Sequence, residues 1–110
     1  MEPLESAPLD LDDALSALDR IPLLARESAR AQLLGARVRC RGRLGSLKAV
    51  SADRLKVGII MRSDDVYFEV ARHSYPWLLT ATHGIPVQAE GTLTRFEIGV
   101  WLEEASIAIL

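Results

Sequence analysis

The sequence predicts a mainly β protein: a five-stranded β-barrel with one helix between strands three and four, preceded by a short N-terminal helical segment. Apolar residues recur at helical spacing before residue 36 and alternate with polar residues after it. The 110 residues, 49% of them apolar, are enough for one globular domain with its own core. We therefore expect an acidic helical extension over residues 1–35 and the barrel over residues 36–110.

The extension is expected to form two helices. Asp10 or Asp12 can cap the first, and Pro22 suits the first turn of the second. The second helix is expected to end at Gly35, because glycine readily adopts the left-handed conformation found after a helix. The apolar face of the first helix comprises Leu11, Leu15 and Leu18. Helices this short are marginal alone, so we expect them to pack on the barrel.

Five segments with a period of two follow, and turn residues separate them. We expect strands over residues 36–44, 55–62, 66–71, 87–94 and 100–109. Gly42 and Gly45 permit a sharp bend or bulge by which a long first strand can serve both sheets of a barrel. Between the third and fourth strands, Ser74 can cap a helix that has Pro76 in its first turn and ends at Gly84. The order of three strands, a helix and two strands is that of the OB-type barrel.

Three stretches carry a resemblance to a known group of families. The first is a helix that runs into the strand at residues 35–44, the second is the strand at residues 85–93, and the third is residues 100–107, which read Val-Trp-Leu-Glu-Glu-Ala-Ser-Ile. Together they resemble the bacterial OB-fold families grouped as tRNA-anticodon-binding-like domains, over about residues 30–110. The resemblance implies the barrel, and we carry over no functional residue from it, because one fold hosts many functions.

Four arginines at alternate positions are the strongest chemical signal. They are Arg37, Arg39, Arg41 and Arg43. Their side chains leave one face of a strand roughly 7 Å apart, close to the spacing of phosphates along an extended single strand. We expect Lys56 and Arg62 to face outward beside this row, and Tyr67 to add a surface on which a base can stack. The alternative is a solvated strand face in a protein whose high arginine content follows from a GC-rich genome.

The charge is unevenly distributed. Residues 1–20 carry six acidic side chains and one arginine, whereas the remaining residues carry twelve basic and nine acidic side chains. Such asymmetry indicates an electrostatic partner or masking of the basic face. We favour the simpler alternative, in which the acidic segment is a solvated lead-in.

The remaining candidates give no indication of catalysis. His73 and His83 have no further ligand at metal-binding spacing, and Cys40 alternates inward as a small apolar residue. Trp101 is expected to point outward from its strand, either as an interface anchor or, as we prefer, beneath the N-terminal helices. We expect no enzyme, no cofactor and no metal.

The leading hypothesis is therefore a non-catalytic module that binds single-stranded nucleic acid through Arg37, Arg39, Arg41, Arg43, Lys56, Arg62 and Tyr67. The rival is a protein-interaction module, an accessory or inhibitory subunit that uses the barrel surface and the N-terminal helices. A homo-oligomer is a third possibility. No secretory leader or membrane-spanning run is visible, so we expect a cytoplasmic protein without a membrane partner.

Overall fold

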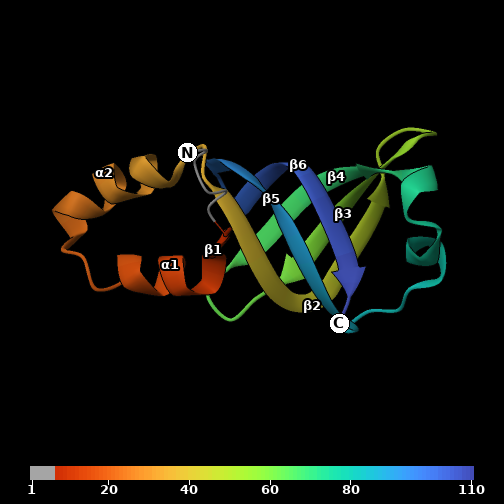
Figure 1. Ribbon diagram of the computed structural model, residues 1–110, viewed down its shortest axis with the longest axis horizontal. Helices are drawn as coiled ribbons and strands as arrows, with labels where there is room; N and C mark the ends of the chain where they lie inside the picture. Colours follow the sequence, from red (N-terminus) through yellow and green to blue (C-terminus); the bar gives the residue numbers. More distant parts are fainter. Residues whose placement is uncertain (1–6) are drawn as a thin grey trace, which may run out of the picture.

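The computed structural model describes residues 7–110 (Figure 1). Its elements are β1 (Leu9–Asp10), α1 (Leu11–Leu18), α2 (Leu23–Leu33), β2 (Arg37–Ala49), β3 (Arg54–Ile60), β4 (Asp65–Ala71), the 3-10 helices η1 (Arg72–Ser74) and η2 (Pro76–Thr80), β5 (Pro86–Phe96) and β6 (Val100–Ile109). The predicted fold class is confirmed. Glu2 and Glu5, two of the acidic residues near the N-terminus, lie outside the described residues.

The sheet closes into a barrel because β2 pairs with strands on two sides. The strand order is β1-β2-β3-β4-β6-β5, and β2 also pairs with β5. Residues Arg37–Arg43 of β2 run antiparallel to β5, and residues Arg43–Ala49 run antiparallel to β3. The circle is completed between β4 and β6, which are parallel but pair only at Val66–Val100 and Tyr67–Trp101.

A β-bulge in β2 changes which residues face outward. The register with β3 shifts between Leu44 and Ser46. Before the shift Leu44 is buried, whereas after it Ser46 and Lys48 are exposed and Leu47 is partly buried. A β-bulge bends its strand and increases the local twist, which allows one long strand to belong to both walls of the barrel.

Helix α1 closes one end of the barrel (Figure 1). Leu11, Leu15 and Leu18 are all buried, in the same cluster as the inward-facing side chains of the strands. The expected N-cap is confirmed at Asp10, whose carboxylate accepts a hydrogen bond of 3.0 Å from the Asp13 amide. The extension therefore contributes side chains to the core of the barrel, and the boundary at residue 35 does not separate two hydrophobic cores.

Helix α2 packs far less closely. It has no buried residue, and Leu23 and Leu24 at its start are 76% and 100% exposed. The Arg26 guanidinium donates to the carbonyls of Asp19 and Ile21, so the turn between the helices is held from the α2 side. The helix is followed by Gly35, whose φ of 90° is in the left-handed region as expected.

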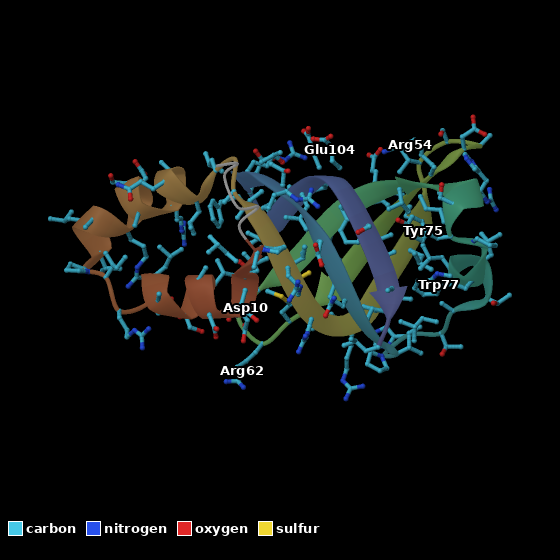
Figure 2. The ribbon with its side chains drawn as sticks, in the orientation of Figure 1. Asp10, Arg54, Arg62, Tyr75, Trp77 and Glu104 are labelled. Atoms are coloured by element: carbon cyan, nitrogen blue, oxygen red, sulfur yellow. The ribbon has the colours of Figure 1, made fainter. Side chains whose placement is uncertain are left out.

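The helix expected over residues 74–84 is instead two short 3-10 helices. Pro76 lies in the first turn of η2, and Leu78 is its buried residue. Because this segment buries one apolar side chain, a longer α-helix would bury little more apolar surface than the 3-10 helices do. Tyr75 and Trp77 lie at the end of the barrel away from α1 (Figure 2).

Candidate nucleic-acid interface

The four arginines of β2 project outward along the seam with β5, and each is hydrogen-bonded across it. Arg37 donates to the Thr92 hydroxyl (3.5 Å) and the Glu104 carbonyl (3.2 Å), Arg39 to the Glu90 carboxylate (3.3 Å), Arg41 to the Gln88 side-chain oxygen (2.8 Å) and Arg43 to the Gly84 carbonyl (2.9 Å). We call these four residues the arginine row. A guanidinium has further N–H donors, so these contacts orient each group and leave it able to bind an anion.

The row keeps most of its positive charge. Within residues 7–110, the Arg39–Glu90 pair is the one ion pair that a member of the row makes. The side chains of that pair are 36% and 30% exposed. The residues Arg37, Arg41 and Arg43 are exposed, so the N-terminal helices do not cover them.

The other predicted site residues divide between two places. Arg62 lies in the exposed turn after β3. In the same turn, the Ser63 hydroxyl donates a hydrogen bond to the Asp12 carboxylate of α1. Arg62 is at the same end of β3 as Ile60, the partner of Arg43, and Figure 2 shows it on the α1 side of the barrel. The expectation that Lys56 lies beside the row is wrong, because Lys56 pairs with Lys48 on the other half of β2.

Tyr67 also lies away from the row, and it contacts an aromatic partner from another strand. Its ring centroid is 5.2 Å from that of Trp101, with the two planes inclined by 34°. Lys56 Nζ lies 5.4 Å from the Tyr67 centroid and 5.3 Å from that of Trp101. The guanidinium carbon of Arg95 lies 4.2 Å from the Trp101 ring. We call these four residues the cation–aromatic cluster.

Sequence reasoning missed Arg95 and misplaced Trp101. The preference for Trp101 beneath the N-terminal helices is wrong, because Trp101 pairs with Tyr67 across the β4–β6 seam. Its outward direction was visible from the alternation with Val100 and Leu102, which are both buried. Its neighbour was not visible, since the parallel register of β4 and β6 depends on how the barrel closes.

Local contacts fix both rings. The Trp101 indole N–H donates to the Glu97 carbonyl at 2.9 Å, which ties the ring to the β5–β6 turn. Tyr67 lies between two glycines, since a Cβ built on Gly58 would lie 3.3 Å from one edge of its ring and a Cβ on Gly99 2.7 Å from the other. Desolvation on burial, followed by the nearby charge of Asp65, raises the pKa of Tyr67. Its hydroxyl therefore remains a hydrogen-bond donor at neutral pH.

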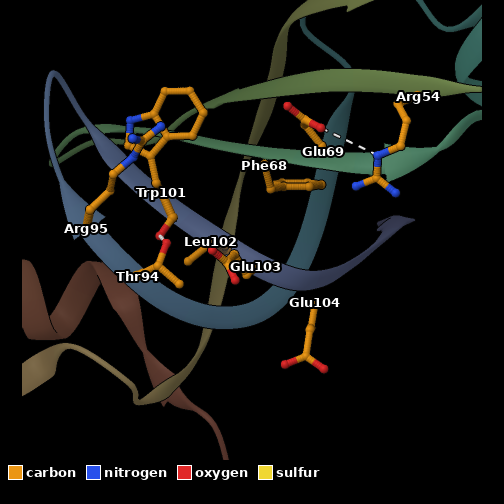
Figure 3. Close-up of a pocket in the computed structure, with 9 residues that line it drawn as sticks. All are labelled: Arg54, Phe68, Glu69, Thr94, Arg95, Trp101, Leu102, Glu103 and Glu104. Carbon is orange, nitrogen blue, oxygen red and sulfur yellow. Dashed lines mark hydrogen bonds and ion pairs between the residues drawn. The ribbon is translucent and has the colours of Figure 1, made fainter. Parts of the chain in front are cut away.

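A groove of about 570 Å³ opens beside the cluster, where β4 and β6 diverge (Figure 3). Phe68 and Leu102 lie at its base, and Arg95 and Trp101 lie at one end. Its walls carry Arg54, paired with Glu69 at 3.4 Å, together with Glu103 and Glu104. This excess of carboxylates makes the groove a poor site for phosphate.

The described residues also bear on other chemistries. Within residues 7–110, no group of three or more His, Cys, Asp or Glu side chains could hold a metal ion. The same residues include no helix that is long and apolar enough to cross a membrane. Burial raises the pKa of the Cys40 thiol to about 11, so little of the nucleophilic thiolate forms at neutral pH.

Taken together, the closed barrel, its strand order and the parallel β4–β6 pairing define an OB-type barrel. No protein-family model matches the sequence, and the comparison with curated proteins gives no match. The predicted resemblance is therefore confirmed for the OB-type barrel, and membership of the tRNA-anticodon-binding-like families stays a prediction.

Solved structures share the fold at low sequence identity. One is a "putative nucleic acid-binding lipoprotein" from Klebsiella pneumoniae, with a TM-score of 0.63 and 12% identity, covering 93% of this chain and 91% of that one. That coverage exceeds the barrel alone, so the match includes part of the N-terminal extension. The asparaginyl-tRNA synthetase of Pyrococcus horikoshii has a TM-score of 0.55 and 18% identity over 71% of this chain and 20% of its own. OBody AM1L10, bound to hen egg-white lysozyme, has a TM-score of 0.57 and 20% identity over 72% of this chain and 82% of its own.

Proposed function

We propose that this protein is a non-catalytic OB-fold module that binds single-stranded nucleic acid on the outer surface of its barrel. The observation that carries the proposal is the cation–aromatic cluster, in which Tyr67 and Trp101 lie 5.2 Å apart beside two cationic side chains. Proteins that bind single strands combine aromatic rings, which stack on bases, with positive groups that follow the backbone.

Each member of the cluster has a role in this proposal. Unstacked bases pack against the exposed parts of Tyr67 and Trp101, or on the guanidinium plane of Arg95, which can stack as an aromatic ring does. Lys56 and Arg95 already lie close to the rings, and their charges are available to the phosphates between successive bases. The cluster therefore supplies both contacts that an extended strand needs.

The arginine row is the second contact region in this proposal. It lies on the β2–β5 seam, whereas the cluster lies on β3, β4, β5 and β6, so the two regions face different sides of the barrel. A ligand that contacts both has to pass around the barrel, with bases held at the cluster and phosphates at the row. Hydrogen bonds across the seam orient the row in advance, which lowers the entropy lost on binding.

The comparisons support the class of ligand and nothing finer. The Klebsiella protein of similar fold is named for nucleic-acid binding, and it is similar over both the barrel and part of the extension. We also propose that the protein catalyses no reaction and that it is located in the cytoplasm.

The experiment is a fluorescence anisotropy titration of a short labelled oligothymidine with the full chain and with Trp101→Ala. Loss of one stacked base costs about 1–3 kcal/mol, so the Kd should rise about fivefold to more than a hundredfold. Tyr75→Ala, which removes an aromatic ring at the opposite end of the barrel, is the matched control. Unchanged binding by Trp101→Ala, with both variants folded as judged by thermal unfolding, would contradict the role of the cluster.

A second function is favoured by a different observation. Leu23 and Leu24 expose an apolar start to α2, and OBody AM1L10 is a barrel of this fold bound to a protein. A protein-interaction module of this kind, or a homo-oligomer, would show no salt-sensitive binding of oligonucleotides. A pull-down would then recover a discrete complex, or light scattering would give a multiple of the mass of the chain.

A further inference from the structure

A shallow trough of about 180 Å³ lies on the outer face of β3, next to Tyr67. Its lining includes Gly45, Ser46, Gly58, Ile60, Asp65 and Tyr67. The volume is about that of six water molecules in the liquid, enough for a flat heterocycle lying on the sheet.

Two glycines allow the side chains around the trough to pack closely against the sheet. Gly58 pairs with Ser46 on one side and with Tyr67 on the other. A Cβ there would collide with the Ser46 hydroxyl oxygen and come within 3.3 Å of the Tyr67 ring. On the adjacent strand, a Cβ on Gly45 would lie 2.7 Å from the Ile60 side chain. The Ser46 hydroxyl and the Tyr67 ring therefore already lie over Gly58, which is buried, and the Ile60 side chain lies over Gly45. A larger residue at either position would displace these side chains.

A carboxylate lies at the side of this trough. Asp65 is the first residue of β4, and its contact with the Tyr67 hydroxyl is long, at 3.5 Å. Among residues 7–110, it forms no ion pair. Its oxygens can therefore accept hydrogen bonds from a ligand, and a carboxylate accepts two parallel N–H donors especially well.

We propose that the trough binds one nucleobase of the single strand and that it prefers guanine. This inference rests on the proposed function. The Watson–Crick edge of guanine carries two adjacent donors, N1–H and the N2 amino group, which match the two oxygens of Asp65. Adenine and cytosine offer one amino group there, and thymine and uracil offer one imide N–H.

The charges around the trough fit a base better than a phosphate. Asp65 repels phosphate, whereas Lys56 and Arg95 attract it from the other side of the Tyr67 and Trp101 rings. The backbone then runs on the cationic side of the rings, and the base points over Gly58 toward the carboxylate.

The experiment compares oligothymidine probes that carry one central guanine with probes that carry hypoxanthine instead, which lacks the N2 amino group. The DNA and RNA versions of both probes are titrated against the full chain, Asp65→Asn and Asp64→Asn. Asp64 is the adjacent carboxylate, so its variant makes the same change in charge outside the trough. Asp64→Asn should bind every probe somewhat more tightly, because it removes a negative charge. Asp65→Asn should show the same gain with the hypoxanthine probes, whereas with the guanine probes it also loses the bidentate contact.

We expect the chain to bind guanine about tenfold more tightly than hypoxanthine, the discrimination of a good bidentate contact. Asp64→Asn should keep this ratio and Asp65→Asn should abolish it. A ratio near one in the unaltered chain, or a ratio that Asp65→Asn leaves unchanged, overturns the guanine site while nucleic-acid binding stands. If no probe binds at all, the proposed function itself fails. A preference confined to DNA or to RNA would identify which polymer supplies the base.

Discussion

Arg39 and Glu90 lie directly opposite each other on β2 and β5, and their side chains form an ion pair of 3.3 Å. This pair places one negative charge within an otherwise positive row. If phosphates bind the row, Glu90 opposes them and competes for Arg39. The row then binds a polyanion less tightly than its arginine content suggests.

Glu90→Gln should therefore tighten the binding of single strands. A partly exposed charge contributes about 0.5–1 kcal/mol, so we expect the Kd to fall about two- to fivefold at low salt. Glu27→Gln is the matched control, because it makes the same change in charge at an exposed position of α2, outside both the row and the cluster. An equal gain from both variants would show only a general effect of net charge.

Arg41→Gln should change how binding depends on salt. Each phosphate contact to a single strand contributes about 0.7 to the slope of log K against log salt concentration, so the slope should become shallower by about that amount. Titrations at several salt concentrations measure it. Arg72→Gln removes an exposed arginine at the start of η1 and should leave the slope as it is. If Arg41→Gln does the same, the row takes no part in binding.

The stability of the protein should fall at high pH because of Cys40. Burial raises its pKa from 9.0 to about 11, so the unfolded chain loses this proton first as the pH rises. The folded state then holds more protons than the unfolded state, and the free energy of unfolding decreases between those two values by up to about 3 kcal/mol. Urea unfolding at several pH values, compared with Cys40→Ala, isolates this contribution. Parallel curves for the two proteins would contradict it.

Leu11→Ala should destabilise the whole protein. The Leu11 side chain is fully buried beneath the end of the barrel, and replacing such a leucine by alanine costs about 2–5 kcal/mol. Leu24→Ala, at a fully exposed leucine of the neighbouring helix, should change stability by less than about 0.5 kcal/mol. Urea unfolding measures both. A small effect of Leu11→Ala would mean that the extension folds apart from the barrel.

Most of the fold could be predicted from the sequence, because its signals are local. The spacing of Leu11, Leu15 and Leu18 defined the buried face of α1, and alternation identified all five barrel strands to within a few residues at most ends. The first strand is the exception. Its regular alternation ends at residue 44, whereas the strand continues to Ala49, since the bulge interrupts the alternation. The bulge expected at Gly42 or Gly45 is confirmed between Leu44 and Ser46. The pairing of β1 with β2 spans two residues, too few to leave a pattern.

The candidate site was predicted only in part, because its neighbours come from distant strands. Alternation placed the four arginines on one face, and the structure has them there. It could not indicate that Gln88 and Glu90 lie opposite them, or that Lys56 lies on another side of the barrel. Tyr67 and Trp101 are likewise brought together by the parallel β4–β6 pairing, which no local pattern encodes.

The bulge at Leu44–Ser46 makes the effect of a deletion in β2 depend on where it falls. Odd-numbered residues face solvent before it and even-numbered residues face solvent after it. Loss of Gly45 would remove the extra residue and restore one continuous alternation, with Leu47 still toward the interior and Lys48 still toward water. Loss of a residue elsewhere in β2 would turn part of the strand over, so we expect natural variation in length among related chains to fall at the bulge or in the β2–β3 turn.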